Sequence, residues 1–456
     1  MTERLSNLVV PLAQKATAMR IPDTAGSVQV RSGAVSRVIL SRPGDVDSTI
    51  NPRTPGIRTS TTATRTTTTS AARSGLVPSA DGSGRPHADF SFPELVQAYF
   101  DCRRSKRNSE TALAFEQSLE TNLHTLYDDL RTGSYAPGPS ICFVITRPKP
   151  REVWAAEFRD RIVHHLLYNR VCDRFHRAFI ADSCACIPGR GTLYAAERLE
   201  AKIRSITQNW SRPAYYLKLD LANFFVSIDK RILRDFLATR IHEPWWMSLA
   251  ETILFHDPRQ SFQFRGDPSR LVLVPFHKRL TSQPAHLGLP IGNLSSQFFA
   301  NIYLNELDQF AKRQLGARHY IRYVDDFVIL HESADWLNDA LDKINEFLPA
   351  TLNVRLNHKK TILQPVARGV DFVGQVIKPW HRTVRKRTRN EGLRRAETIP
   401  AGDLFETANS YFGLFRQATH SHSDRAALAN VLRARGHAVK GDLTKTYRRT
   451  THGISK

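Results

Sequence analysis

Two aspartates, Asp325 and Asp326, stand side by side in the apolar stretch HYIRYVDDFVIL (319–330). Burying one unpaired carboxylate is costly, and two adjacent carboxylates repel each other. A third carboxylate, Asp220, ends the apolar stretch YYLKLD (215–220) in a similar setting. If both stretches are strands of one sheet, the carboxylates converge on one surface as ligands for divalent cations. Two such ions could clamp the oxygens of a phosphoryl transfer, whereas hydrogen-bonded structural acids are the alternative reading.

The chain that carries these carboxylates is strongly basic overall. The 456 residues include 65 Lys and Arg against 43 Asp and Glu, a net charge of +22. Such a balance favours a polyanionic partner, most simply nucleic acid, and a solubilising surface is the alternative. Hydrophobic residues make up 41% of the chain, enough for a core, and the length suggests two to four lobes of about 150 residues each.

The cysteines and apolar runs indicate a cytoplasmic protein. Of five cysteines only Cys184 and Cys186 are close together, which favours reduced thiols over a zinc site or a disulfide. No apolar run approaches the about 18 residues of a membrane helix. The short patch LVVPLA (8–13) follows Glu3, which is not typical of a secretory signal. We therefore expect no membrane partner.

Residue patterns divide the chain into an extension and a folded part. Residues 1–86 are rich in Ser, Thr and Arg, which predicts a disordered basic extension, either a loose nucleic-acid arm or a dispensable tail. Beyond it, periodicity predicts helices at 109–130, 157–179, 293–315 and 333–350 and hairpins at 140–156 and 319–330. It also predicts a strand that runs into a turn or helix at 214–230 and another strand at 369–377. This order predicts an α+β fold, a small antiparallel sheet with helices on one face.

At this point the residues resemble a known family. YVDDF (323–327) on a hairpin, with LKLDLANFF (217–225) upstream, resembles the palm of reverse transcriptases. Further segments resemble other motifs of that family in the same order: RPKPREVWAAEFRDRIVHHLL (147–167) and SCACIPGRGTLYAA (183–196) in the fingers, the glycine loop and helix GLPIGNLSSQFFANIYLNELD (288–308), and LNHKKT (356–361) and DFVGQVI (371–377) after the hairpin.

The resemblance implies both an architecture and an activity. The fold would be a right-hand polymerase with fingers (87–210), an antiparallel-sheet palm (211–380) and a thumb (381–456). The activity would be RNA-directed DNA polymerisation by two-metal nucleotidyl transfer, with two Mg²⁺ ions that Mn²⁺ could replace. The partners would be a template RNA, a DNA or RNA primer, and dNTPs.

The glycine-loop motif narrows the subfamily. Group II intron and retron enzymes carry PQG and a later SP, where this chain has Ile291 and Gln297. IGNLSSQ (291–297) resembles diversity-generating-retroelement reverse transcriptases, which implies error-prone copying and a small basic accessory protein. A defence-associated or orphan bacterial reverse transcriptase is an alternative, and a catalytically silent RNA-binding scaffold is an alternative of another class. A nuclease would not need the glycine loop, and an RNA polymerase usually carries GDD in place of YVDD.

The resemblance also assigns roles near the carboxylates. Asp220 and Asp325 would hold both metal ions, with Asp326 as a third carboxylate and the backbone carbonyl of Leu221 as a further ligand. Lys360 would protonate the leaving pyrophosphate, although Lys359 beside it leaves the register open.

A second group of residues would bind the incoming nucleotide: Lys149, Arg151, Arg190, Phe225, Ile291, Gly292 and Gln297. The three cations would contact the triphosphate, because its negative charge needs stabilisation. Phe225 would exclude a ribose hydroxyl, with Phe224 as the rival residue and core packing as the alternative role. Ile291 cannot donate a hydrogen bond where Gln could, which predicts a more permissive site.

The last basic stretch, KPWHRTVRKRTRNEGLRR (378–395), carries eight Lys and Arg against one Glu. It would belong to a thumb that grips the phosphate backbone, and a solvated basic linker is the alternative. The expected nucleic-acid-binding residues are Arg382, Arg385, Lys386, Arg387 and Arg389.

Overall fold

The computed structural model describes residues 88–104, 106, 109–147 and 149–447. The predicted disordered extension at 1–86 lies outside these described residues.

A four-stranded antiparallel sheet carries the three aspartates. Its strand order is β5-β6-β3-β7, and its members are β3 (Tyr215–Asp220), β5 (His319–Tyr323), β6 (Asp326–His331) and β7 (Ile362–Pro365). The register places Asp220 directly opposite Asp326. Both predicted apolar stretches are therefore neighbouring strands of one sheet.

Helices cover both faces of this sheet, whereas one covered face was expected. Leu219 and Phe327 point into a core shared with α9 (Leu294–Gln309) and α10 (Ala334–Leu352). Tyr216 and Val328 pack on the other side against α5 (Thr192–Ile206). Successive side chains of a strand point to opposite faces, so a strand that is apolar at consecutive positions is buried on both.

A second, three-stranded sheet is built around the predicted hairpin. Strands β1 (Ser140–Ile145) and β2 (Arg151–Ala155) pair antiparallel, which confirms the hairpin. The short strand β4 (Phe262–Phe264) pairs parallel to β1, so a segment far along the chain joins this sheet. The expected boundary between fingers and palm is therefore crossed by one strand.

Helices α1 (Phe92–Arg103), α2 (Glu110–Glu116), α3 (Leu119–Thr132) and α4 (Phe158–His176) accompany this sheet. The helix predicted at 109–130 is two helices, because the backbone leaves helical geometry at Ser118. The side chain of Asn122 donates a hydrogen bond to the carbonyl of Phe115 at 2.8 Å, which satisfies the end of α2 at the break.

Short elements connect β3 to the glycine loop. They are α6 (Phe224–Ser227), α7 (Lys230–Ala238), α8 (Pro244–Phe255) and the 3₁₀ turns η1 (Pro268–Leu273), η2 (Phe276–Lys278) and η3 (Leu280–Ser282). After the glycine loop, α9 ends in a π-helical turn, η4 (Phe310–Gln314). The 3₁₀ turns η5 (His358–Lys360) and η6 (Val366–Arg368) flank β7.

The C-terminal part begins with a sheet of its own. Strands β8 (Val370–Phe372), β9 (Gln375–Lys378) and β10 (His381–Val384) form it in the order β10-β9-β8. The single strand predicted at 369–377 is thus a hairpin, because Val373 and Gly374 both have positive φ and turn the chain. It does not join the aspartate-bearing sheet, whose edge is β7.

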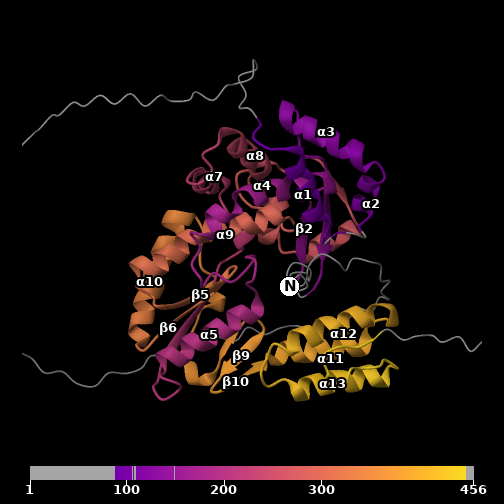
Figure 1. Cartoon of the computed structure of the whole chain (residues 1–456). Coiled ribbons are helices and arrows are strands. Elements are labelled where there is room, and N and C mark those ends of the chain that lie inside the picture. The colour runs from indigo at the N-terminus through magenta and orange to yellow at the C-terminus, as the bar shows by residue number, and fades with distance from the viewer. Residues whose placement is uncertain (1–87, 105, 107–108, 148, 448–456) are drawn as a thin grey trace, which may run out of the picture. The chain divides into compact units, whose positions relative to one another are not determined.

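Three helices follow this sheet and lie side by side: α11 (Lys386–Thr398), α12 (Ala401–Phe415) and α13 (His422–Ala434) (Figure 1). They enclose a separate core that includes Leu404, Phe412 and Leu432. Among the described residues no helix is both long and apolar enough to cross a membrane. All five cysteines are free thiols.

Candidate active site

A cleft of about 530 Å³ opens beside the three aspartates. It brings together most of the residues expected from the sequence: Lys149, Arg151, Asp220, Leu221, Phe225, Ile291, Gly292, Gln297, Asp325, Asp326 and Lys360. These residues come from the β1–β2 hairpin, the four-stranded sheet and its β5–β6 turn, helices α6 and α9, the glycine loop and the turn before β7. A volume of several hundred Å³ is the usual size of a small-molecule site.

The β3–β6 pairing and the β5–β6 turn place the carboxylates. Asp325 occupies the two-residue turn between Tyr323 and Asp326, which are paired across the hairpin. The backbone N–H of Leu221 donates to the carbonyl of Asp325 at 3.3 Å, which ties the turn to the end of β3. Asp220 is only 4% exposed.

The carboxylates destabilise one another's charge. Burial raises the pKa of Asp325 to about 6, and the neighbouring charges of Asp220 and Asp326 contribute to this shift. The pKa of Asp326 is also raised, chiefly by burial and then by Asp220, while Lys218 opposes the shift. A site that concentrates buried negative charge in this way favours a bound cation.

Asp220 already has a cationic neighbour. Its Oδ2 accepts a hydrogen bond from Lys360 Nζ at 2.5 Å, and its Oδ1 accepts one from Asn357 Nδ2 at 3.1 Å. The backbone N–H of Asn357 also donates to the Asp220 carbonyl at 2.8 Å. Lys360 lines the cleft and Lys359 does not, so the structure favours the register expected for Lys360.

The donor set fits divalent cations. Carboxylate oxygens of Asp220, Asp325 and Asp326, with the nearby carbonyl of Leu221, are the hard oxygen ligands that Mg²⁺ and similar ions prefer. The described residues of the cleft offer no competing set of soft ligands, since Cys186 is the single sulfur donor in its wall.

A buried arginine holds the turn that carries Asp325. Arg322 is 1% exposed, and its Nε and Nη2 each bind one carboxylate oxygen of Asp308 at 2.7 Å. Its Nη1 donates to the carbonyl of Val324 at 3.1 Å. Val324 has φ +56, a conformation that is strained for a β-branched residue.

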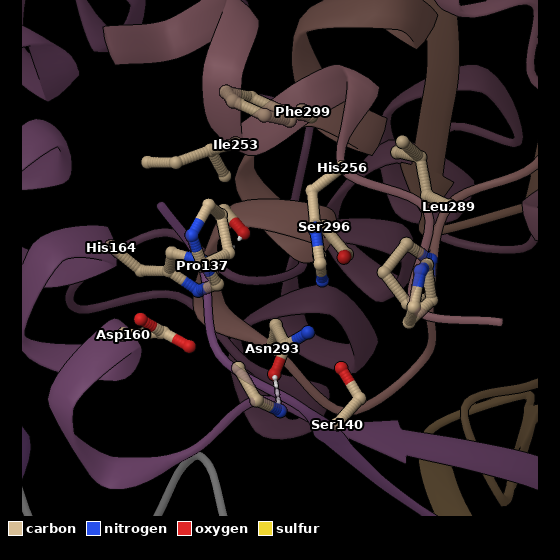
Figure 2. Close-up of a pocket in the computed structure, with 14 residues that line it drawn as sticks. Pro137, Ser140, Asp160, His164, Ile253, His256, Leu289, Asn293, Ser296 and Phe299 are labelled. Carbon is tan, nitrogen blue, oxygen red and sulfur yellow. Dashed lines mark hydrogen bonds between the residues drawn. The ribbon is translucent and has the colours of Figure 1, made fainter. Parts of the chain in front are cut away.

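The glycine loop is hydrogen-bonded to β2. The N–H of Trp154 donates to the carbonyl of Ile291 at 2.8 Å. The N–H of Ala156, directly after β2, donates to Asn293 Oδ1 at 3.0 Å (Figure 2). Gly292 has φ +132, and a Cβ at this position would lie 2.9 Å from the carbonyl oxygen of Trp154. Only glycine allows this approach without a shift of the backbone.

A small cavity of about 20 Å³ lies behind this loop and is lined in part by Asn293, His164 and Asp160 (Figure 2). It is large enough for about one water molecule and far too small for a nucleotide. Burial lowers the pKa of His164 to about 3, so its ring is neutral, and its Nδ1 lies 3.3 Å from Ser295 Oγ. The cavity is therefore part of the structure that supports the glycine loop and is not a nucleotide-binding site.

The two adjacent phenylalanines differ in position. Phe224 is 2% exposed and lies in the core, whereas Phe225 is half-buried. The carbonyl of Phe225 accepts a hydrogen bond from the N–H of Leu289 at 2.8 Å, which fixes it against the glycine loop. Both rings line the cleft, and the more accessible Phe225 suits the expected contact with a sugar.

Positive charge gathers at the β2 side of the cleft. Lys149 and Arg151 are exposed there, and Lys278, which the sequence motifs did not indicate, lines the same wall. The pKa of Lys149 is lowered by burial first and then by the charges of Lys360 and Lys278. Cations gathered on one wall are a ready site for an anion.

Arg190 is placed differently. It is absent from the cleft wall, and its Nη1 donates to the carbonyls of Ile180 and Ser183 at 2.8 and 2.7 Å. The structure therefore gives it a role in holding the loop before α5, which differs from the expected contact with a triphosphate.

The expected nucleic-acid-binding arginines are also partly engaged within the protein. Arg382 is 5% exposed and pairs with Glu200 at 3.1 Å and Glu197 at 3.7 Å. Arg385 pairs with Asp371, and Arg389 pairs with Asp424 at 2.7 Å. Lys386 and Arg387 are exposed and make no ion pair with a described residue. These two keep their charges available to a partner.

Comparison with known proteins gives the chain's relationships. The family model described as reverse transcriptase (RNA-dependent DNA polymerase) matches residues 148–377, half of the chain. No curated protein matches the sequence. Among solved structures, a Candida albicans telomerase with a fragment of telomeric RNA is 9% identical with a TM-score of 0.40, covering 71% of this chain and 59% of that one. An apo telomerase from Candida tropicalis is 13% identical with a TM-score of 0.42, covering 65% and 57%. The chain thus spans less than two thirds of the length of these structures.

Proposed function

Since this chain belongs to the reverse transcriptase (RNA-dependent DNA polymerase) family, we propose that it copies an RNA template into cDNA from a DNA or RNA primer. The observation that carries the proposal is the cleft itself. It combines Asp220, Asp325 and Asp326 with the cations Lys149 and Arg151 across a glycine loop. Oxygen ligands for metal ions thus face an anion-binding wall, the pairing that nucleotidyl transfer from a triphosphate needs.

Three carboxylates and the Leu221 carbonyl would hold two Mg²⁺ ions, for which Mn²⁺ could substitute. When bound, these ions activate the primer 3′-hydroxyl and offset the charge that develops on the phosphates. The new bond joins the primer 3′-oxygen to the α-phosphorus, and the bond from that phosphorus to pyrophosphate breaks.

The other groups of the cleft bind the triphosphate and supply a proton. Lys149 and Arg151 hold the β- and γ-phosphates, with Lys278 on the same wall. Lys360, whose ammonium group contacts Asp220, carries the proton that the leaving pyrophosphate takes up.

The half-buried ring of Phe225 supports a preference for dNTPs over rNTPs. A ribose 2′-hydroxyl placed against an aromatic ring would be buried without a hydrogen-bond partner. The carbonyl of Phe225 is bonded to the glycine loop, so the backbone that carries the ring is tied to that loop.

We further propose error-prone synthesis of the diversity-generating-retroelement type, carried out in the cell together with a small basic accessory protein. Ile291 lines the cleft through a side chain that cannot hydrogen-bond to a base or sugar. A site that makes fewer hydrogen bonds to the nucleotide discriminates less strongly between correct and incorrect nucleotides. A defence-associated or orphan bacterial reverse transcriptase would share the same cleft.

A catalytically silent RNA-binding scaffold is the candidate of another class. It would have no use for three neighbouring carboxylates in one cleft, where burial and the charge of Asp220 raise the pKa of Asp325 and of Asp326. Replacing them by neutral residues would make such a scaffold more stable.

Primer extension on an RNA template, with Mg²⁺ or Mn²⁺ and either dNTPs or rNTPs, tests the proposal. We expect dNTP-dependent extension in the wild type and a loss of about 1000-fold or more in Asp325→Asn, which keeps the shape but loses a metal-ligating charge. Arg190→Gln, outside the cleft, is the matched control. Sequencing the cDNA reads its error spectrum. RNA binding without extension, with native RNA and partner proteins present, would support the scaffold.

A further inference from the structure

An exposed apolar patch lies on the segment between α8 and the glycine loop. Val272 is 78% exposed, Phe276 is 71% exposed and Leu273 is 52% exposed, all within turns η1 and η2. Large apolar side chains at such exposure, gathered in one segment, mark a binding surface.

The patch is held in a fixed position by what lies beneath it. Val274 is fully buried and Leu280 is 4% exposed, so Phe276 stands between two buried anchors, and Val272 and Leu273 directly precede the first. The buried carboxylate of Glu152 on β2 accepts hydrogen bonds from the N–H of Leu280 at 2.5 Å and from the hydroxyl of Thr281 at 2.9 Å. A ring presented on an anchored turn loses little entropy when a partner stacks on it.

The surroundings of the patch are basic. Residues 262–282 contain four Lys and Arg, namely Arg265, Arg270, Lys278 and Arg279, against the single acid Asp267. Arg279 turns inward and donates to the carbonyl of Val274 at 2.7 Å, while Arg270 and Lys278 are exposed. The exposed charge is therefore complementary to phosphate.

The patch is continuous with the catalytic cleft. Lys278 is two residues from Phe276 and lines the cleft, as do Leu280 and its anchor Glu152. Lys278 also lies close enough to Lys149 for its charge to depress that residue's pKa, after the larger effect of burial. A strand leaving the cleft past Lys278 would meet Phe276 next.

We propose that this segment, residues 268–279, holds the unpaired part of the template strand ahead of the cleft, with one base stacked on Phe276 and phosphates near Arg270 and Lys278. The inference rests on the proposed polymerase function. Aromatic faces beside cations bind single strands without reading their sequence, because every base has a face to stack. An apolar protein partner fits the basic rim and the continuity with the cleft less well.

Binding of primer–template pairs with different overhangs tests the inference. Two RNA templates are annealed to one DNA primer, leaving a single unpaired 5′ nucleotide or about ten, enough to cross a stacking site. Dissociation constants are measured without dNTPs. We expect Phe276→Ala to weaken binding of the long overhang by about 5- to 100-fold and to leave the short one unchanged, since one stacking platform is removed. Phe276→Trp should bind as the wild type does.

The matched control is Phe100→Ala, which removes a ring that is 55% exposed on α1. It should change binding of neither substrate. An equal effect of Phe276→Ala on both overhangs, or no effect, would overturn the inference and leave the patch to a protein partner. This binding measurement needs no catalysis. If the wild-type protein were inactive in primer extension but still showed overhang-dependent binding, the proposed function would be refuted and the template site would be supported.

Discussion

At the scale of single residues, the position of Asp325 depends on a strained neighbour. Val324 adopts φ +56, which costs about 1–3 kcal/mol for a side chain of this kind. Its carbonyl accepts a hydrogen bond from Arg322, whose charge is neutralised by Asp308 at the end of α9. Asp308 is fully buried, so the ion pair is shielded from water. Arg322 thus fixes the turn that presents Asp325, the proposed metal ligand.

We expect Arg322→Lys to lower kcat for primer extension by about 10- to 100-fold, because a displacement of about 1 Å at a reacting group has that cost. Lysine keeps the charge but cannot donate to both oxygens of Asp308 and to Val324 at once. The KM for dNTP should stay within a few-fold of the wild type, since the triphosphate-binding cations are untouched. Steady-state kinetics of primer extension over a range of dNTP concentrations measures kcat and the KM for dNTP separately.

The control for this prediction is Arg174→Lys, which weakens another two-bonded arginine–carboxylate pair, with Glu243. Both variants should lower the melting temperature, but Arg174→Lys should keep its kcat. If kcat fell equally in both, the decrease in Arg322→Lys would reflect stability alone.

The sequence does contain a sign of the buried role of Arg322, but the neighbouring YVDD motif drew attention to the aspartates instead. Arg322 interrupts an apolar strand three residues before Asp325, and a buried arginine needs a buried acid. Glu152 on β2 is a similar case. The identity of each partner could not be predicted, because Asp308 and the N–H of Leu280 come from other elements.

At the scale of elements, the glycine loop and β2 behave as one unit. The backbone of Trp154 bonds to Ile291, and the N–H of Ala156 bonds to the side chain of Asn293. Gly292 lets the two chains approach between these bonds. The proposed nucleotide site is therefore built from two parts of the chain, β2 and the glycine loop, and its shape depends on their separation.

We expect Gly292→Ala to reduce kcat/KM for dNTP by about 100-fold, because the new methyl group would push the loop away from the Trp154 carbonyl. Positive φ adds about 1–3 kcal/mol of backbone strain. The measurement is primer extension over a range of dNTP concentrations. Gly374→Ala is the matched control, since Gly374 also has positive φ but no atom lies within 4 Å of the added Cβ. Similar activity in the two variants would show that the approach to β2 is unimportant.

Local sequence patterns predicted the elements that build the site, but they could not predict strand pairings between segments that are far apart in the sequence. The β1–β2 hairpin, the β5–β6 hairpin and α4 follow from periodicity and turn residues within one segment. Strand β4 has three residues and joins β1 from far along the chain, so no local pattern indicates it. The same holds for β7, which pairs with β3 at the edge of the four-stranded sheet, a sheet that residues 369–377 do not join.

At the scale of the whole molecule, the chain's net charge of +22 is not equally available to a partner. The stretch 378–395 looks like a uniform basic surface in the sequence, yet Arg382, Arg385 and Arg389 are each paired with an acid. Those acids lie on α5, β8 and α13, so the sequence alone could not show which cations are neutralised. Lys386 and Arg387, at the start of α11, are exposed and make no ion pair with a described residue.

This distribution predicts a difference in salt dependence. Each phosphate that the protein no longer neutralises should reduce the slope of log K against log salt by about 1, because fewer counterions are released on binding. We expect Lys386→Gln with Arg387→Gln to reduce the slope for an RNA–DNA duplex by about 2. Affinities measured between about 50 and 200 mM salt give this slope.

Arg382→Gln supplies the contrast, because it removes the same kind of charge from the same stretch. Arg382 is buried beside Glu200 and Glu197, so its replacement should lower the melting temperature and leave the slope of the salt dependence unchanged. A basic linker without a binding role would show no change of slope in either variant. An equal change of slope in the Lys386/Arg387 variant and in Arg382→Gln would mean that Arg382 breaks its ion pairs with Glu200 and Glu197 when the duplex binds. The expected contrast would place the duplex against the start of α11.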